Sequence, residues 1–170
     1  MTGARRSELL ALRWRDVDLS AGTGTINRGR TKGFDGQVFA GRTKSERSRR
    51  TIDIDPATVR ALVEHRQGQD VLNIDGLIFT YAADGKPLHP DGVTQRFHYR
   101  VREAGLKRVS FKGLRRTHAT LLLKGGEPLH VVSRRLGHAD EAFTARQYAH
   151  VQAGQQADAA ARFAAAVDGR

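Results

Sequence analysis

Residues 111–138 read FKGLRRTHATLLLKGGEPLHVVSRRLGH, and this stretch determines the fold class of the chain. The spacing of its apolar residues predicts one helix over residues 114–123 and another from Pro128 to about Arg135. A glycine pair follows the first helix and a single glycine the second, where glycine commonly ends a helix. A further helix is predicted from about Glu141 through Tyr148, so the C-terminal half is expected to be helical.

The residues on either side of this stretch predict more helices and a few short strands. Further helices are predicted over residues 5–14, 56–67, 90–104 and 157–167. Short β-type runs separated by glycine-bearing turns, at residues 24–27, 37–39 and 50–54, predict a small antiparallel meander. The expected fold is therefore mainly α with a small antiparallel β-sheet, an α+β class, in a single domain of 170 residues.

The charge of the chain indicates an anionic partner. There are 29 Lys and Arg residues against 18 Asp and Glu, a formal net charge of +11, and 23 of the basic residues are Arg. The planar guanidinium grips two phosphate oxygens at once, so nucleic acid is the leading candidate. The segment from Arg28 to Arg50 alone contributes +6, which suits a phosphate backbone.

Several function classes find no support in the sequence. The chain has no cysteine, which excludes disulfides, thiol nucleophiles and thiolate zinc sites. It has no phosphate-binding glycine loop, no dinucleotide fingerprint, no His-Glu-x-x-His and no Gly-x-Ser-x-Gly. No apolar run is long enough to span a membrane, and the first residues lack the apolar core of a signal peptide. We therefore expect a soluble intracellular protein without a cofactor.

Cationic residues at predicted helix starts are the first candidates for a site. Arg5 follows Thr2-Gly3-Ala4 at the start of one helix, where backbone N–H groups and a guanidinium together favour an anion. Lys112 and Arg115 repeat this arrangement and, three residues apart, project from one face of a helical turn. Two such sites can bracket one phosphate.

Four segments in this order resemble the catalytic domain of the tyrosine recombinases, the phage-integrase family of site-specific DNA recombinases. They are TGARRSELLALRW at residues 2–14, TKS at 43–45, KGLRRTHA at 112–119 and LGH at 136–138, followed by Tyr148. The resemblance implies six catalytic residues: Arg5, Lys44, Lys112, Arg115, His138 and Tyr148. It gives Glu8 the task of orienting nearby basic groups. Lys112 stands where the family most often has His, so a proton acceptor is replaced by a hydrogen-bond-donating cation.

The implied reaction is a transesterification. Tyr148 attacks the phosphorus of a DNA phosphodiester, which leaves a 3′-phosphotyrosyl link and a free 5′-hydroxyl. Arg5 and Arg115 stabilise the charge that develops on the phosphate oxygens in place of a metal ion. Lys44 protonates the leaving oxygen, and His138 hydrogen-bonds the phosphate. No nucleotide or metal cofactor is implied.

The resemblance also implies partners and a domain organisation. Double-stranded DNA is the expected partner, bound by a homo-tetramer, and the expected location is cytoplasmic and associated with the nucleoid. Relatives usually carry a helical core-binding domain before the first Arg segment, which here starts at residue 2. We therefore expect residues 1–170 to be a single catalytic domain with the N-terminal core-binding domain absent.

Other functions explain part of the pattern. Residues 114–148 also fit a helix-turn-helix regulator that binds DNA without catalysis. An inactive recombinase remnant is a further possibility, and a type IB topoisomerase shares the implied chemistry. The regulator explains the charge but leaves the placement of Arg5, Lys44 and Tyr148 unexplained.

Overall fold

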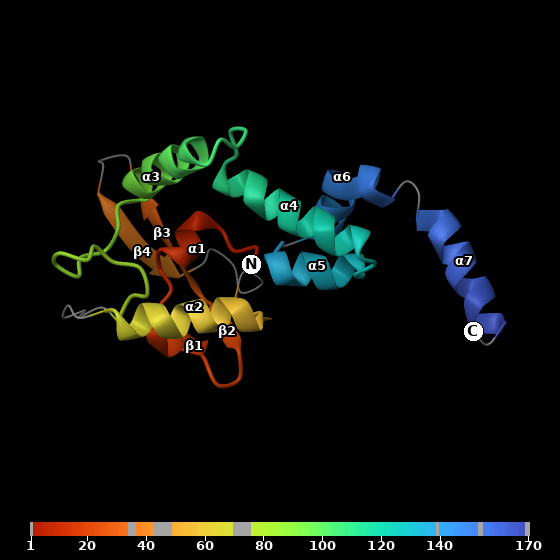
Figure 1. Ribbon diagram of the computed structural model, residues 1–170, viewed down its shortest axis with the longest axis horizontal. Coiled ribbons are helices and arrows are strands. Elements are labelled where there is room, and N and C mark those ends of the chain that lie inside the picture. The colour runs from red at the N-terminus through yellow and green to blue at the C-terminus, as the bar shows by residue number, and fades with distance from the viewer. Residues whose placement is uncertain are drawn as a thin grey trace.

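The computed structural model describes residues 2–33, 37–42, 49–69, 76–138, 140–152 and 155–168. The strands gather in the N-terminal part of the chain, and the helices α4, α5 and α6 pack to one side of them (Figure 1). The helices are α1 (Arg6–Leu9), α2 (Pro56–Gln67), α3 (Pro90–Glu103), α4 (Phe111–Lys124), α5 (Leu129–Leu136), α6 (Glu141–Gln152) and α7 (Gln155–Val167). The strands are β1 (Val17–Asp18), β2 (Thr23–Ile26), β3 (Arg28–Lys32), β4 (Val38–Arg42) and β5 (Arg50–Asp53).

The strands form two small antiparallel sheets. One has the order β1-β2-β5, and the other is the hairpin β3-β4. The predicted meander was wrong in its order, because β2 pairs directly with β5, with Ile26 opposite Arg50. The intervening hairpin leaves this sheet and is tied to α3 by an ion pair of 3.1 Å between Lys32 and Asp91.

The N-terminal helix is shorter than predicted. The sequence pattern extends from Arg5 to Trp14, but α1 ends at Leu9. The backbone then turns to pair with the segment around Leu77: Trp14 N donates to Gly76 O at 2.9 Å, and Ile78 N donates to Leu12 O at 3.0 Å. Leu10, Ala11 and Leu12 still donate backbone hydrogen bonds to α1, and pairing with the distant segment begins at Leu12 O and Trp14 N.

The remaining predicted helices are confirmed, and several of them have a capping residue at one end. The Asp55 carboxylate accepts a hydrogen bond from the backbone N–H of Thr58 and caps α2, with Pro56 in the first turn. The Ser110 hydroxyl caps α4 by accepting from Gly113 N. Gly137 ends α5 in the left-handed conformation.

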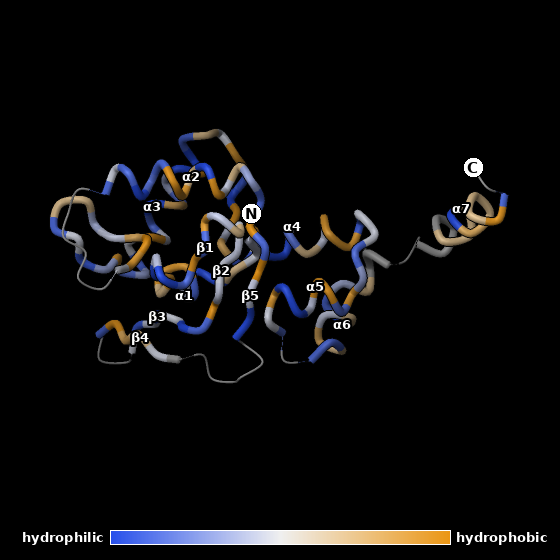
Figure 2. The backbone as a smooth tube through the Cα atoms, turned by 90° about the horizontal axis from the view of Figure 1, so that it is seen from below, coloured by the Kyte–Doolittle hydropathy of each residue, from blue (hydrophilic) through white to orange (hydrophobic). Residues whose placement is uncertain are grey.

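The core next to the site is formed by α4, α5 and α6. Its buried cluster consists of Ala119, Leu123, Val132, Leu136 and Tyr148. By contrast, α7 projects beyond α6 and away from the sheets in both views (Figures 1 and 2), and its described residues from 159 onward are exposed. Among the described helices, none combines the length and apolar character that a membrane span requires.

Candidate active site

The C-terminal end of α5 gathers three arginines from three other parts of the chain. The last carbonyls of a helix have no partner within it and carry the negative end of its dipole. Here three consecutive carbonyls each accept a hydrogen bond from a different guanidinium. The bonds are Arg50 Nε to Arg135 O (2.7 Å), Arg115 Nη2 to Leu136 O (2.6 Å) and Arg5 Nη2 to Gly137 O (3.2 Å). The helix end thus brings together β5, α4 and the residue that precedes α1.

Gly137 makes this arrangement possible. Its backbone has φ 68° and ψ 48°, a region that side chains disfavour. A Cβ atom at this position would lie 2.6 Å from Nη1 and 3.0 Å from Cζ of Arg50. The absence of a side chain therefore lets the buried guanidinium pass against the helix end.

Replacing Gly137 by alanine should lower the free energy of unfolding by about 2–3 kcal/mol, because the left-handed backbone and the contact with Arg50 both oppose a Cβ. Gly105→Ala is the matched control, since Gly105 has φ 65° but open space around the missing Cβ. Urea denaturation of both variants separates the two contributions. An equal decrease in the free energy of unfolding in both variants would contradict a contribution from the tight contact with Arg50.

One buried carboxylate balances the arginines. Glu8 is 4% exposed and Arg50 7% exposed. Arg50 Nη2 lies 2.8 Å from Glu8 Oε2, and Arg5 Nη1 lies 2.7 Å from Glu8 Oε1. Burial alone would raise the pKa of the Glu8 carboxyl, but the hydrogen bonds and charge of Arg50, together with Arg5, hold this pKa below its ordinary value. Glu8 is therefore ionised at neutral pH and orients both guanidinium groups.

The site carries an excess of positive charge. Within the described part of the chain, three guanidiniums (Arg5, Arg50 and Arg115) outnumber the one carboxylate that forms ion pairs with them, Glu8. Burial and the neighbouring charge of Arg5 lower the pKa of Arg115 to about 10, which still leaves it protonated at neutral pH. Arg115 is oriented further by Nη1, which donates to Gly3 O at 2.8 Å. Such a cluster is suited to an anion with several oxygens, such as a phosphodiester.

His138 lies at the same helix end and is uncharged. Its Nδ1 lies 2.6 Å from the Thr144 hydroxyl oxygen, and its ring meets the Phe143 ring edge to face with centroids 5.1 Å apart. Burial, and then the charges of Arg115 and Arg5, lower the pKa of His138 to about 4. The imidazole is therefore neutral at physiological pH.

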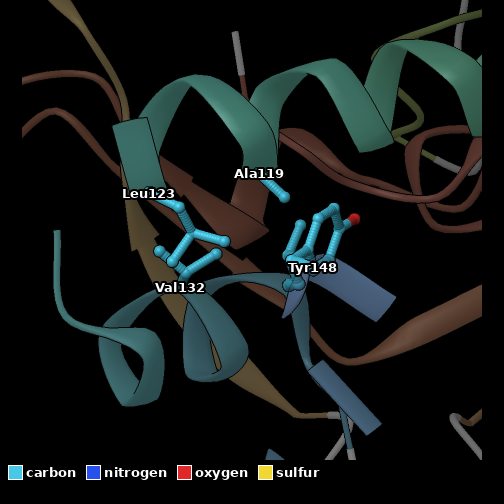
Figure 3. Packing of buried hydrophobic residues seen from close by; sticks show 5 residues of the cluster. Ala119, Leu123, Val132 and Tyr148 are labelled. Atoms are coloured by element: carbon cyan, nitrogen blue, oxygen red, sulfur yellow. The ribbon is translucent and has the colours of Figure 1, made fainter. Parts of the chain in front are cut away.

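Tyr148 combines a buried ring with a polar tip. Its ring packs beside Ala119, and its hydroxyl is directed away from Leu123 and Val132 (Figure 3). The backbone at Tyr148 is non-helical, with φ −122° and ψ 16°, which kinks α6 at this residue. Among the described residues the hydroxyl has no hydrogen-bond partner. Burial raises the pKa of Tyr148, and the charge of Arg115 opposes this rise.

Not all six predicted site residues are brought together. Arg5, Arg115 and His138 surround the end of α5, and Tyr148 is electrostatically coupled to Arg115. Lys112 lies exposed on the first turn of α4 and makes no hydrogen bond or ion pair with the described part of the chain. Lys44 lies outside the described residues.

The sequence interpretation missed two residues that contact the candidate site. No role was predicted for Arg50, although strand alternation places it on the inward face with Ile52, where a charged residue is unusual. Thr144 was missed as well, because a threonine inside a helix carries no distinctive signal before its contact with His138 is known.

Acid should destabilise the protein through two histidines, the buried His118 and the partly buried His138. The pKa of His138 is lowered to about 4, and that of His118 is lowered to about 4 by burial and by Arg135. An unfolded chain binds protons on these rings from about pH 6.5 downward, whereas the folded chain does not. The contribution of these neutral rings to the free energy of unfolding is therefore complete above pH 6.5 and decreases as the pH falls toward 4. The urea midpoint should fall as the pH is lowered from 7.5 to 4.5, and it should fall less steeply in His138→Gln. The same dependence of the midpoint on pH in His138→Gln and in the wild type would contradict a contribution from His138.

Comparison with known proteins identifies the family. The model of the phage integrase family matches residues 1–155. The chain belongs to the phage integrase family. This integrase-family chain is 32% identical over 163 residues to the integrase of Staphylococcus phage L54a, covering 89% of this chain and 45% of the relative. It is 26% identical over 168 residues to the ICEBs1 integrase of Bacillus subtilis (strain 168), covering 94% and 45%. The chain thus spans about half the length of these relatives.

A solved structure supports the fold of this integrase-family chain. The Tn1549 transposon integrase in complex with circular intermediate DNA superposes with a TM-score of 0.70 at 20% identity, over 86% of this chain and 51% of that one. The fold class predicted from the sequence and the predicted family are both confirmed. The likeness extends to the fold alone at this level of identity.

Proposed function

We propose that residues 1–170 form the single catalytic domain of a site-specific DNA recombinase that cleaves and rejoins DNA through a 3′-phosphotyrosyl intermediate. The observation that carries the proposal is the gathering of Arg5, Arg50 and Arg115 on the end of α5, where the structure shows the Glu8 carboxylate paired with two of them. Family membership supports the choice of DNA strand transfer over other chemistry at phosphate.

In this proposal Arg5 and Arg115 bind the scissile phosphate. Arg5 and Arg115 each use part of the guanidinium for the α5 carbonyls and keep other N–H donors for phosphate oxygens. The side chain of Arg5 is 41% exposed, whereas that of Arg50 is 3% exposed. We therefore assign phosphate contact to Arg5 and Arg115 and a supporting role to Arg50. Donors fixed before the reaction stabilise the charge of the transition state most effectively.

Tyr148 is the proposed nucleophile. Its oxygen bonds to phosphorus as the bond from phosphorus to the 5′ oxygen breaks, so the energy of the bond is retained for rejoining. The raised pKa of Tyr148 means that the hydroxyl has to lose its proton during attack. We propose Lys44 as the group that protonates the leaving 5′ oxygen. Lys112, exposed on α4, is proposed to contact the DNA phosphate.

DNA is the proposed partner. The Tn1549 transposon integrase was solved with circular intermediate DNA, and this chain has a net charge of +11. We further propose a homo-tetramer on DNA, in a nucleoid-associated location. The exposure of α7 beyond the rest of the domain leaves it available for a neighbouring subunit.

Covalent trapping tests the proposal directly. The protein is incubated with a pool of nicked duplexes, without added metal or nucleotide, and separated in SDS. We expect a protein–DNA adduct, and nuclease digestion followed by mass spectrometry should place the remaining nucleotide on Tyr148. Salt-sensitive DNA binding without any adduct would instead support the regulator or the inactive remnant, and a nucleotide on another residue would overturn the assignment of the nucleophile.

A further inference from the structure

A buried histidine that the proposed mechanism does not use lies one helical turn after Arg115. His118 is 8% exposed, and because it follows Arg115 by three residues on α4, both side chains leave the same face of the helix. Its Nε2 accepts a hydrogen bond of 3.2 Å from Nε of Arg135. Burial and the charge of Arg135 lower the pKa of His118 to about 4. The imidazole is therefore a neutral acceptor at physiological pH.

Arg135 joins the end of α5 to the sheet. Its Nη2 donates to the carbonyl of Asp53, the last residue of β5, at 2.9 Å. In the opposite direction, Nε of Arg50 in β5 donates to the carbonyl of Arg135 at 2.7 Å. The two arginines thus form reciprocal bonds from side chain to backbone between the same two elements. Since His118 holds Nε of Arg135, this side chain links α4, α5 and β5.

The ring of His118 also determines where the backbone runs at Gly3. A Cβ atom on Gly3 would lie 2.5 Å from Cδ2 and 3.0 Å from Nε2 of His118, so the backbone lies directly against the imidazole. The φ of 67° at Gly3 is a further reason why this position requires glycine. The carbonyl of Gly3 accepts a hydrogen bond of 2.8 Å from Nη1 of Arg115.

Both acceptors of Arg115 are therefore supported by the same pair of residues. Nη1 donates to Gly3 O, whose backbone lies against His118, and Nη2 donates at 2.6 Å to Leu136 O, next to Arg135 in the chain. A planar guanidinium held at both Nη groups is restrained from rotating, so its remaining N–H donors keep one direction. Donors fixed in this way stabilise charge on a bound anion without having to reorient.

We propose that His118 and Arg135 are positioning residues that fix both carbonyl acceptors of Arg115, and thereby the direction in which Arg115 presents its remaining donors to a phosphate. Neither residue touches the phosphate. The consequence for cleavage rests on the proposed function, in which Arg115 stabilises the charge that develops on the phosphate oxygens. The restraint on Arg115 exists in the protein without DNA.

The restraint can be measured on the free protein by ¹⁵N–¹H spectra of the guanidinium groups. Rotation about the Nε–Cζ bond averages the two Nη nitrogens of a mobile arginine, whereas Arg115 should give two separate Nη signals, identified by their loss in Arg115→Lys. His118→Leu keeps an apolar side chain but removes the acceptor, and the two signals should merge. His118→Gln carries an amide oxygen at the same distance along the side chain as Nε2 and should restore them.

The matched control is His130→Leu, at an exposed histidine in the first turn of α5, and it should keep the two Nη signals of Arg115 separate. Near-ultraviolet circular dichroism shows whether each variant is folded. If His118→Leu does not fold, Arg135→Met removes the same hydrogen bond from its partly exposed partner and should give the same averaging. Averaged signals in the wild type, or separate signals in a folded His118→Leu or Arg135→Met protein, would overturn the proposal.

The cleavage assay separates this inference from the proposed function. His118→Leu should slow adduct formation at saturating DNA by roughly tenfold to a hundredfold, because a small misplacement of a reacting group costs up to that much. DNA affinity should change little, since many other cations contact the backbone, and His118→Gln should recover the rate. A wild type with separate Nη signals but no adduct would refute the proposed function and leave the positioning role intact. Wild-type cleavage by a His118→Leu protein with averaged Nη signals would refute the catalytic consequence.

Discussion

Tyr148→Phe should abolish covalent attachment of the protein to nicked DNA. The substitution removes only the hydroxyl oxygen, which is the atom proposed to bond to phosphorus. The ring that packs beside Ala119, Leu123, Val132 and Leu136 is retained, so the α4–α5–α6 core keeps its packing. The hydroxyl has no partner among the described residues, and its removal leaves none of them with an unpaired polar group. The expected result is a loss of adduct below detection with an unchanged urea midpoint.

The matched control for this variant is Tyr99→Phe. Tyr99 lies on α3 with 49% of its surface exposed and is far less buried than Tyr148 at 4%. We expect Tyr99→Phe to form the adduct at the wild-type rate. DNA affinity, measured by fluorescence anisotropy at two salt concentrations, should be the same in all three proteins. An adduct that persists in Tyr148→Phe would remove Tyr148 from the mechanism, whatever its effect on stability.

Glu8→Gln should produce the largest loss of stability among isosteric changes at the site. The carboxylate is buried and balances Arg5 and Arg50, and an amide of the same shape supplies no charge. Removing one partner of a buried ion pair typically costs about 3–5 kcal/mol, because the other charge stays buried and unpaired. We expect a decrease in the free energy of unfolding near the lower end of this range, since Gln still accepts one hydrogen bond.

A second carboxylate in the same chain serves as the control for Glu8. Glu103 also lies 2.7 Å from an arginine, Arg100, but its side chain is 45% exposed. Solvent screens such a pair, so Glu103→Gln should leave the urea midpoint almost unchanged. A similar decrease in the free energy of unfolding in Glu8→Gln and Glu103→Gln would show that burial does not determine how much the Glu8–Arg50 ion pair contributes to stability. Glu8→Gln should also weaken DNA cleavage, because Arg5 loses the group that orients it.

The sequence predicted the helices whose ends and apolar faces are determined by residues close to one another in the sequence. The helix α2 was found because Asp55 and Pro56 mark its first turn, and α4 was found because its apolar residues follow helical spacing up to a glycine pair. The segment after Leu9 was misjudged, because its helical spacing competes with pairing to residues 76–78, and nothing near it in sequence announces that pairing. The order of the strands was missed for the same reason, since β2 and β5 are separated by the whole β3-β4 hairpin.

The site was only partly predictable for a related reason. Arg5, Arg115 and His138 stand out in short motifs, and the structure places all three at the end of α5. Arg50 does not stand out, because its neighbours in sequence are also basic and only its burial distinguishes it. The environment of Tyr148 was likewise not predictable, since a raised pKa depends on packing between three helices.

The hydrogen bonds at the end of α5 make one short helix the common reference for three cations of the candidate active site. Helical geometry fixes the carbonyls of Arg135 and Leu136 relative to each other, and the left-handed conformation of Gly137 fixes the third carbonyl beside them. Arg50, Arg115 and Arg5 are held on these three carbonyls. Each guanidinium is therefore positioned by a carbonyl at the end of α5 as well as by the element that carries it. One helix end thus serves as the shared frame of reference for three side chains that come from distant parts of the chain.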